Sequence, residues 1–233
     1  MVDVPPVDMQ RPQQHPRRSG KRALVVGVGS YTHAPLTNTL NDATDMHAAL
    51  KRMGFEAALV LDCDIEALYE AVRAFMYELQ RGDIAVFFFA GHGVEHQDTN
   101  WLICKEVPKD QKTLPLKAYD VQKLLQEMQE RQTYFNLIIL DCCRNSPLPS
   151  SARGVMGGLC ALLAPKGSMI CFACAPKQVA SDGSPSDRNG IFTKHLLKHI
   201  EVPDQPVQAR KDPISARSAH THTCPTLAAE PIH

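Results

Sequence analysis

Two apolar runs of the sequence end in side chains that are suited to nucleophilic chemistry. The ends are Asp141-Cys142-Cys143 after residues 137–140 and Gly91-His92-Gly93 after residues 84–90. Short apolar runs of this kind predict buried parallel strands, and in open α/β sheets chemistry gathers beyond the carboxyl ends of such strands. A thiol and an imidazole should therefore leave two strands at comparable points. This pattern indicates a cysteine-nucleophile hydrolase.

The imidazole has a definite task in such an enzyme. A cysteine attacks a carbonyl as the thiolate, and its ordinary pKa of roughly 8.5 requires a neighbouring base near neutral pH. His92 can be that base. The backbone amide of Gly93, together with that of the nucleophile, can donate to a developing oxyanion. We expect the glycines on either side of His92 to let the chain turn tightly at the strand end. A histidine between glycines can also be only a turn residue, and the cysteine run is what favours catalysis.

The elements that must position these groups alternate along the chain. Strands are expected near residues 23, 57, 84, 137 and 168, and amphipathic helices near 42–53, 68–79, 121–128 and 190–200. Such alternation predicts βαβ units and a largely parallel sheet with helices on both faces. Residues 101–104 are expected to form a short strand or hairpin, and residues 146–158 a long mobile loop beside the nucleophile.

Composition limits the class of protein. The chain has 233 residues, of which 44% are hydrophobic and 21% charged, and its formal net charge is zero. These values are typical of one globular domain without a global attraction to nucleic acid or to anionic membranes. No apolar run approaches the roughly 20 residues of a membrane-spanning helix, and residues 1–20 lack the apolar core of a secretory signal. We expect a cytoplasmic protein with a disordered arm (1–20), one domain (21–201) and a disordered or poorly packed tail (202–233).

Metal binding is the main rival to nucleophilic chemistry. Residues 92–96 fit the H-x-x-E-H motif, but that motif needs a helix, and here a strand runs into two glycines. His195 and His199 lie one helical turn apart without a third ligand at useful spacing. The C-x-x-C pair of residues 171–174 falls in a predicted strand, where residues three apart face opposite ways. The eight cysteines therefore favour buried or catalytic thiols. We expect neither a metal nor a cofactor.

The motifs resemble those of one peptidase family. F-A-G-H-G at 89–93 and L-D-C-C-R at 140–144 resemble the His and Cys motifs of the caspase-like cysteine peptidases, which comprise caspases, metacaspases and paracaspases. With N-G-I-F at 189–192, the pattern looks most like the paracaspases, and it spans roughly residues 21–200. The resemblance implies a three-layer α/β/α sandwich with a mostly parallel sheet, and a cysteine endopeptidase whose catalytic residues are His92 and Cys143.

Strand alternation separates the two neighbouring thiols. Adjacent residues of a strand face opposite ways, so only one thiol can point at His92. The motif spacing assigns the nucleophile to Cys143, two residues after Asp141. Cys142 is then expected to pack in the core.

Acidic residues predict the substrate. Caspases, which cleave after Asp, have Gln two residues before the nucleophile, whereas Asp141 supplies a negative charge suited to Arg or Lys. The resemblance implies two further acids in this pocket, Asp42 and Asp182. Asp42 can also be only a helix-cap acid, and Asp182 a solvated loop acid. The expected partners are protein or peptide substrates with a basic residue before the scissile bond.

A second class of function remains, which is a catalytically silent caspase-like module that binds partners. Its hallmark is loss of the catalytic His or Cys, and both are present here. The resemblance also implies a final strand after the helix at 190–200, often used in dimerisation, and the Pro-rich tail offers no candidate for it. We therefore expect a monomer or weak homodimer.

Overall fold

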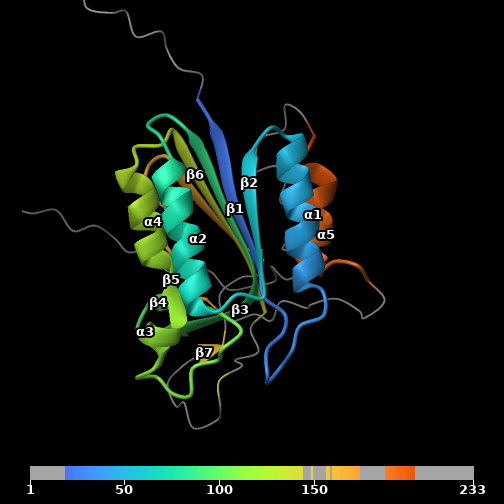
Figure 1. Ribbon diagram of the computed structural model, residues 1–233, viewed down its shortest axis with the longest axis vertical. Coiled ribbons are helices and arrows are strands. Elements are labelled where there is room, and N and C mark those ends of the chain that lie inside the picture. Colours follow the sequence, from blue (N-terminus) through green and yellow to red (C-terminus); the bar gives the residue numbers. More distant parts are fainter. Residues whose placement is uncertain (1–18, 144–147, 149–155, 158, 174–186, 203–233) are drawn as a thin grey trace, which may run out of the picture.

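The computed structural model describes residues 19–143, 148, 156–157, 159–173 and 187–202. The expected N-terminal arm up to residue 18 and the tail from residue 203 lie outside the described residues, as does most of the expected loop 146–158. The described part forms a three-layer α/β/α sandwich, as the sequence predicts (Figure 1).

A parallel sheet forms the middle layer. Its strands run in the order β2-β1-β3-β6-β8, and all four neighbouring pairs are parallel. Their bounds are β1 Lys21–Gly27, β2 Glu56–Leu61, β3 Ile84–His96, β6 Phe135–Cys143 and β8 Ser168–Phe172. All five lie where the apolar runs predict strands. The chain steps outward from β1 to β2 and then returns to the other side at β3, so the strand order reverses between β1 and β3. Open α/β sheets bind ligands at such a reversal.

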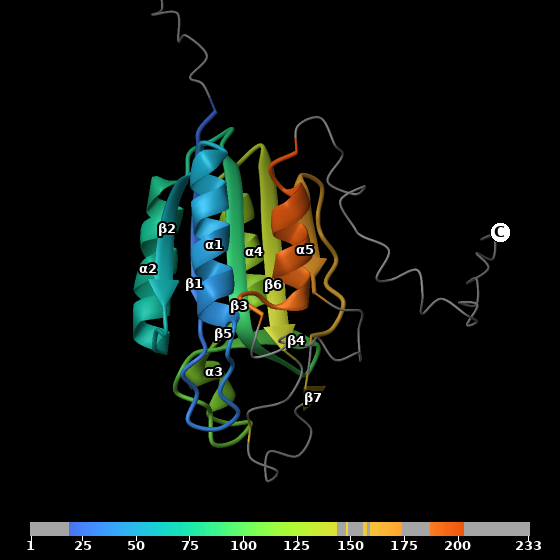
Figure 2. The same cartoon turned by 90° about the vertical axis from the view of Figure 1, so that its right-hand side faces the viewer.

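Helices cover both faces of this sheet. The helices are α1 Thr39–Arg52, α2 Ile65–Glu78, α3 Leu114–Lys117, α4 Val121–Glu130 and α5 Ile191–His199. Helices α2 and α4 lie on one face, and α1 and α5 on the other; Figure 2 looks onto the α1 and α5 layer. Each face has its own apolar core, because alternate strand residues point to opposite sides.

Strand β3 is longer than its neighbours and has two roles. Its first part lies between β1 and β6, and its last residues pair antiparallel with β4 (Thr99–Ile103) and β7 (Met156–Gly157). Strand β4 also pairs with β5 (Ala118–Asp120). Gln97 and Asp98 join β3 to β4 with φ angles of 52° and 58°, which suits a two-residue hairpin turn. The expected hairpin around residues 101–104 is confirmed.

The expected turn at residues 91–93 is wrong. The strand continues through His92 to His96, and neither flanking glycine has a positive φ angle. A β-carbon at Gly91 would lie 2.7 Å from the Tyr31 hydroxyl oxygen, and one at Gly93 would lie 3.0 Å from the Cys142 sulfur. These glycines therefore provide space for close neighbours and do not bend the chain. The same extended backbone confirms that residues 92–96 are not a helix.

Two further expectations need correction. Helix α1 begins at Thr39, so Asp42 lies inside its first turn and is not the cap residue; the cap position is Asn38. Residues 156–157, expected in a mobile loop, pair with β3 as strand β7. A two-residue strand carries too little pattern to be recognised in a sequence.

Strand β3 carries His92, so we test how much the buried residues of this strand contribute to the stability of the fold. Phe88 lies in the middle of β3 with no exposed surface. We expect Phe88→Ala to lower the free energy of unfolding by about 3–5 kcal/mol, since it removes buried surface and leaves a cavity. Tyr77→Ala is the control, because that aromatic side chain is 84% exposed. Urea denaturation measures both, and similar losses in the two variants would contradict this account of the core.

Candidate active site

The backbone register brings His92 and Cys143 together. In the parallel pair β3–β6, Ala90 lies opposite Asp141, and His92 lies opposite Cys143. Neighbouring strands are about 4.8 Å apart, so the backbones of these paired residues are adjacent. The Cys143 side chain lies outside the described atoms. The predicted nucleophile and base therefore occupy one rung of the sheet, at the carboxyl end of β6.

The loop between β1 and α1 selects the tautomer of the imidazole. The His92 ring is fully buried, and its Nε2 lies 2.7 Å from the carbonyl oxygen of Ala34. A carbonyl oxygen only accepts hydrogen bonds, so Nε2 carries a proton and donates it. Nδ1 is then the ring nitrogen that can accept a proton. Ala34 reaches this position with a φ of 57°, in the left-handed region that non-glycine residues seldom occupy.

Cys142 faces away from the candidate site. It is buried in the core on the α2 and α4 side of the sheet. Its sulfur packs closely against Gly93, because a β-carbon on that glycine would lie only 3.0 Å from it. The prediction that Cys142 packs in the core is confirmed. Because the first of the two thiols is enclosed, Cys143 remains as the candidate nucleophile.

Two acids meet beside Gly190, the residue that precedes α5. The amide N–H of Gly190 donates to Oδ1 of Asp42 at 2.9 Å, and the hydroxyl of Thr193 donates to Oδ2 of Asp141 at 2.6 Å. A β-carbon on Gly190 would lie 3.0 Å from an oxygen of Asp42 and 3.7 Å from an oxygen of Asp141. Both carboxylates therefore lie next to Gly190. Asp42 is almost fully buried, and its side chain binds the backbone of Gly190 instead of capping α1.

A third acid, on α1, anchors the same segment. Asp45, one turn after Asp42, accepts two hydrogen bonds from the Arg188 guanidinium, at 2.7 and 2.8 Å, and one from the Asn189 amide at 2.9 Å. The guanidinium fork matches a carboxylate in this geometry. Helix α1 thus fixes residues 188–190 against the sheet through two acids on one helical face.

The structure brings four of the six predicted site residues into this region. His92 and Gly93 lie in β3 where it pairs with the end of β6, Asp141 lies in that end of β6, and Asp42 binds Gly190 beside Asp141. The backbone of Cys143 pairs with His92, and Asp182 lies outside the described residues.

Sequence reasoning missed Asp45, Arg188 and Thr193. For Asp45 a signal was available, since it follows Asp42 by three residues and this spacing puts both acids on one face of α1. Arg188 and Thr193 flank the N-G-I-F motif, but neither residue type carries a pattern of its own. Their partners are visible only once the chain is folded.

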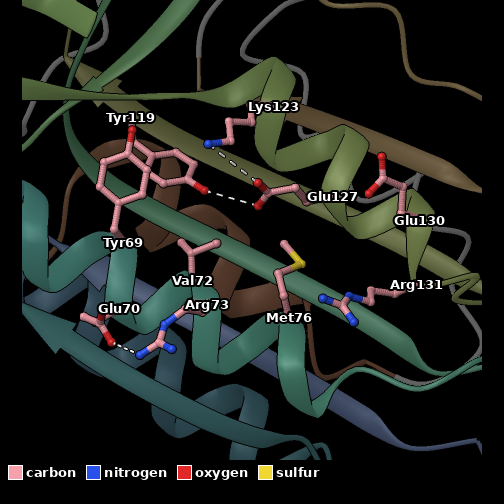
Figure 3. Close-up of a pocket in the computed structure, with 10 residues that line it drawn as sticks. All are labelled: Tyr69, Glu70, Val72, Arg73, Met76, Tyr119, Lys123, Glu127, Glu130 and Arg131. Atoms are coloured by element: carbon pink, nitrogen blue, oxygen red, sulfur yellow. Dashed lines mark hydrogen bonds and ion pairs between the residues drawn. The ribbon is translucent and has the colours of Figure 1, made fainter. Parts of the chain in front are cut away.

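A groove in the described part of the structure lies elsewhere. It has a volume of about 420 Å³ and is lined by α2, α4 and Tyr119 (Figure 3). The Tyr69 and Tyr119 rings lie 4.8 Å apart there, and Lys123 pairs with Glu127 at 3.8 Å. These helices cover the face opposite α1 and α5. None of the predicted site residues lines this groove, so it is separate from the candidate site.

The described residues also bear on metal and membrane binding. Among them, no cluster of three or more His, Cys, Asp or Glu side chains is arranged to hold a metal ion. No helix in the same part of the chain has the length and apolar character needed to span a bilayer.

Comparison with known proteins assigns the family. The family model described as "Caspase domain" matches residues 20–229, so the chain belongs to the caspase-domain family, whose members are in general cysteine peptidases. Within this family, the relatives support the paracaspase branch, as the motifs indicate. The predicted family and fold class are confirmed.

Two curated relatives and one solved structure illustrate the similarity. The human mucosa-associated lymphoid tissue lymphoma translocation protein 1 is 27% identical over 140 residues, covering 60% of this chain and 17% of that protein. Its mouse homolog is 29% identical over 130 residues, covering 55% and 15%. The chain thus matches less than a fifth of the length of either relative. A crystal structure of a protein from Geobacter sulfurreducens has a TM-score of 0.58 at 17% identity, covering 77% of this chain and 81% of that one.

The anchor formed by Asp45 gives a pH-dependent prediction. Hydrogen bonds from Arg188 lower the pKa of Asp45, with Asn189 adding to the effect and partial burial opposing it. A lowered pKa contributes stability that is present above the unfolded-state pKa of about 3.9 and is lost as the pH falls through the folded-state value. Since Arg188 is largely exposed, we expect Asp45→Asn to cost only about 1 kcal/mol at pH 7.

The difference in the free energy of unfolding between wild type and Asp45→Asn should become smaller as the pH falls from about 5 to 3. Urea denaturation across that range measures it. Glu130→Gln is the control for the general effect of removing an acidic charge, because that exposed residue ends α4 on the other face of the sheet. A difference that stays constant, or grows with acidity, would contradict the ion-pair assignment.

Proposed function

We propose that the protein is a cysteine endopeptidase that uses Cys143 as nucleophile and His92 as general base, and that it cleaves after Arg or Lys. The observation that carries the proposal is the β3–β6 register, in which His92 of β3 is paired with Cys143, the last residue of β6. The Ala34 carbonyl supports the same roles, because it leaves Nδ1 of His92 as the proton acceptor.

The reaction proceeds by acyl transfer. Nδ1 of His92 takes the thiol proton of Cys143, and the thiolate adds to the carbonyl carbon of the scissile peptide bond. The C–N bond then breaks, and the imidazolium gives its proton to the leaving amine. Water attacks the thioester, His92 takes a proton from that water, and the C–S bond breaks. The imidazolium returns this proton to the Cys143 thiolate, and the acid product leaves and ionises to the carboxylate. The amides of Gly93 and Cys143 are the proposed donors to the oxyanion.

Two carboxylates beside Gly190 support a basic substrate residue. Asp42 is nearly fully buried, and Asp141 lies two residues before the nucleophile on the same strand. Asp42 accepts a hydrogen bond from Gly190, and Asp141 accepts one from Thr193, which helps to fix both carboxylates in place. Their negative charge attracts Arg or Lys and repels the Asp side chain that caspases select. Asp182 is a third proposed acid of this pocket.

Peptide reporters test the nucleophile. The wild-type protein should hydrolyse reporters that end in Arg, with less or no activity toward those that end in Asp. We expect Cys143→Ala to lower kcat/KM by about 10³-fold or more, since the acyl-enzyme cannot form. Cys142→Ala is the matched control and should retain activity. Activity that survives in Cys143→Ala would refute the assignment, and a folded wild type that cleaves no reporter would favour the silent binding module.

The same reporters test the acidic pocket. We expect Asp141→Asn to lower kcat/KM for the Arg reporter by about 30-fold or more, because removing one partner of a buried charge pair costs about 2–5 kcal/mol. The asparagine oxygen can still accept the Thr193 hydrogen bond, so the fold should be kept. Asp110→Asn is the control on an exposed loop. Equal activity of wild type and Asp141→Asn on the Arg reporter would remove Asp141 from the pocket.

A further inference from the structure

A buried tyrosine hydroxyl joins two strands next to His92. Tyr31 lies in the loop between β1 and α1 and is only 4% exposed. Its hydroxyl oxygen accepts a hydrogen bond from the backbone N–H of His92 at 2.9 Å, and the hydroxyl donates to the carbonyl of Ile103 at 2.9 Å. His92 and Ile103 are paired residues of β3 and β4. The hydroxyl therefore bridges this rung of the antiparallel ladder.

The tyrosine also contacts the imidazole itself. The ring centroids of Tyr31 and His92 lie 4.4 Å apart, with the ring planes tilted by 56°. Tilted aromatic pairs at about this separation attract one another. The same loop supplies the Ala34 carbonyl that holds Nε2. The backbone, the ring and one ring nitrogen of His92 are thus all contacted by residues 31–34.

The loop that makes these contacts is itself fixed. Asp62, just after β2, accepts hydrogen bonds from the backbone N–H groups of Gly29 and Ser30 and from the Ser30 hydroxyl, at 2.6 to 2.9 Å. The N–H of Leu36 closes the loop onto the Gly29 carbonyl at 3.0 Å. Tyr31 is therefore presented to β3 by a short segment that is tied down on both sides.

Gly91 provides the space in which the Tyr31 hydroxyl approaches β3. A β-carbon at that position would lie 2.7 Å from the Tyr31 hydroxyl oxygen and under 3 Å from the Phe89 ring. Only glycine lets the hydroxyl approach β3 at this point. The first glycine of the G-H-G motif is thus explained by Tyr31.

We propose that Tyr31 is a positioning residue for His92, which holds the backbone and the imidazole of this residue in place so that Nδ1 can act as the proton acceptor. The inference rests on the proposed function, because it takes His92 as the base. Burial raises the pKa of Tyr31 well above its ordinary value, so the hydroxyl remains a neutral donor and does not itself exchange protons in the reaction.

Loss of the hydroxyl has a definite structural consequence. The N–H of His92 and the carbonyl of Ile103 both belong to fully buried residues. Without the bridge, these two groups either move together to bond each other, which displaces His92, or lose their partner, which leaves the His92 backbone less firmly held. A displacement of about 1 Å at a catalytic group can cost about 100-fold in rate.

Tyr31→Phe tests the proposal, because it keeps the aromatic contact and removes only the hydroxyl. We expect kcat for the Arg reporter to fall by about 10- to 100-fold with KM nearly unchanged, since the substrate pocket is built from other residues. Tyr119→Phe is the control: Tyr119 is similarly buried, but its hydroxyl meets Glu127 of α4 and not His92. Wild-type kcat in Tyr31→Phe, or an equal fall in Tyr119→Phe, would overturn the proposal.

A second measurement does not depend on catalysis. In the full chain labelled with ¹⁵N-histidine, wild type and Tyr119→Phe should show a single His92 tautomer protonated at Nε2, and Tyr31→Phe should show a shifted or mixed signal. An unchanged His92 spectrum in Tyr31→Phe would refute the positioning role. If the spectrum shifts but wild type cleaves no reporter, the positioning role stands and the proposed peptidase function fails.

Discussion

The parallel register of β3 and β6 is the constraint on which the candidate site depends. One residue of slippage between these strands would turn every side chain of one strand to the other face. The site would then pair His92 with Cys142, a residue that packs in the opposite core. The fully buried phenylalanines of β3 oppose such slippage, because shifting them would empty one core and overfill the other.

Two neighbouring parts of the chain hold the residues that the register brings together. The loop from β1 to α1 holds the imidazole through Tyr31 and Ala34, and helix α1 holds residues 188–190 through its acids. Both parts lie next to the reversal of strand order between β1 and β3. A single stretch of sequence, residues 28–45, therefore supports both the proposed base and the proposed substrate pocket. One continuous segment thus connects the proposed base with the proposed substrate pocket.

The features that could be predicted from the sequence are local ones. Apolar runs located the five parallel strands, and the polar residues that follow two of these runs indicated the candidate site. Strand alternation separated Cys142 from its neighbour. The roles of Gly91 and Gly93 were not predictable in this way, since a glycine that makes space looks the same in a sequence as one that bends the chain. The contact from Asp45 to Arg188 joins residues far apart in the chain, and periodicity carries no information about such pairs.

The most direct test of the account is covalent labelling of the nucleophile. A peptidyl chloromethyl ketone that ends in Arg should alkylate the wild-type chain, and peptide mapping by mass spectrometry should find the adduct on Cys143. The corresponding Asp compound should react far more slowly, because the proposed pocket is acidic. An adduct on Cys142 or on another cysteine, with Cys143 unmodified, would contradict the pairing of Cys143 with His92 as the reactive centre.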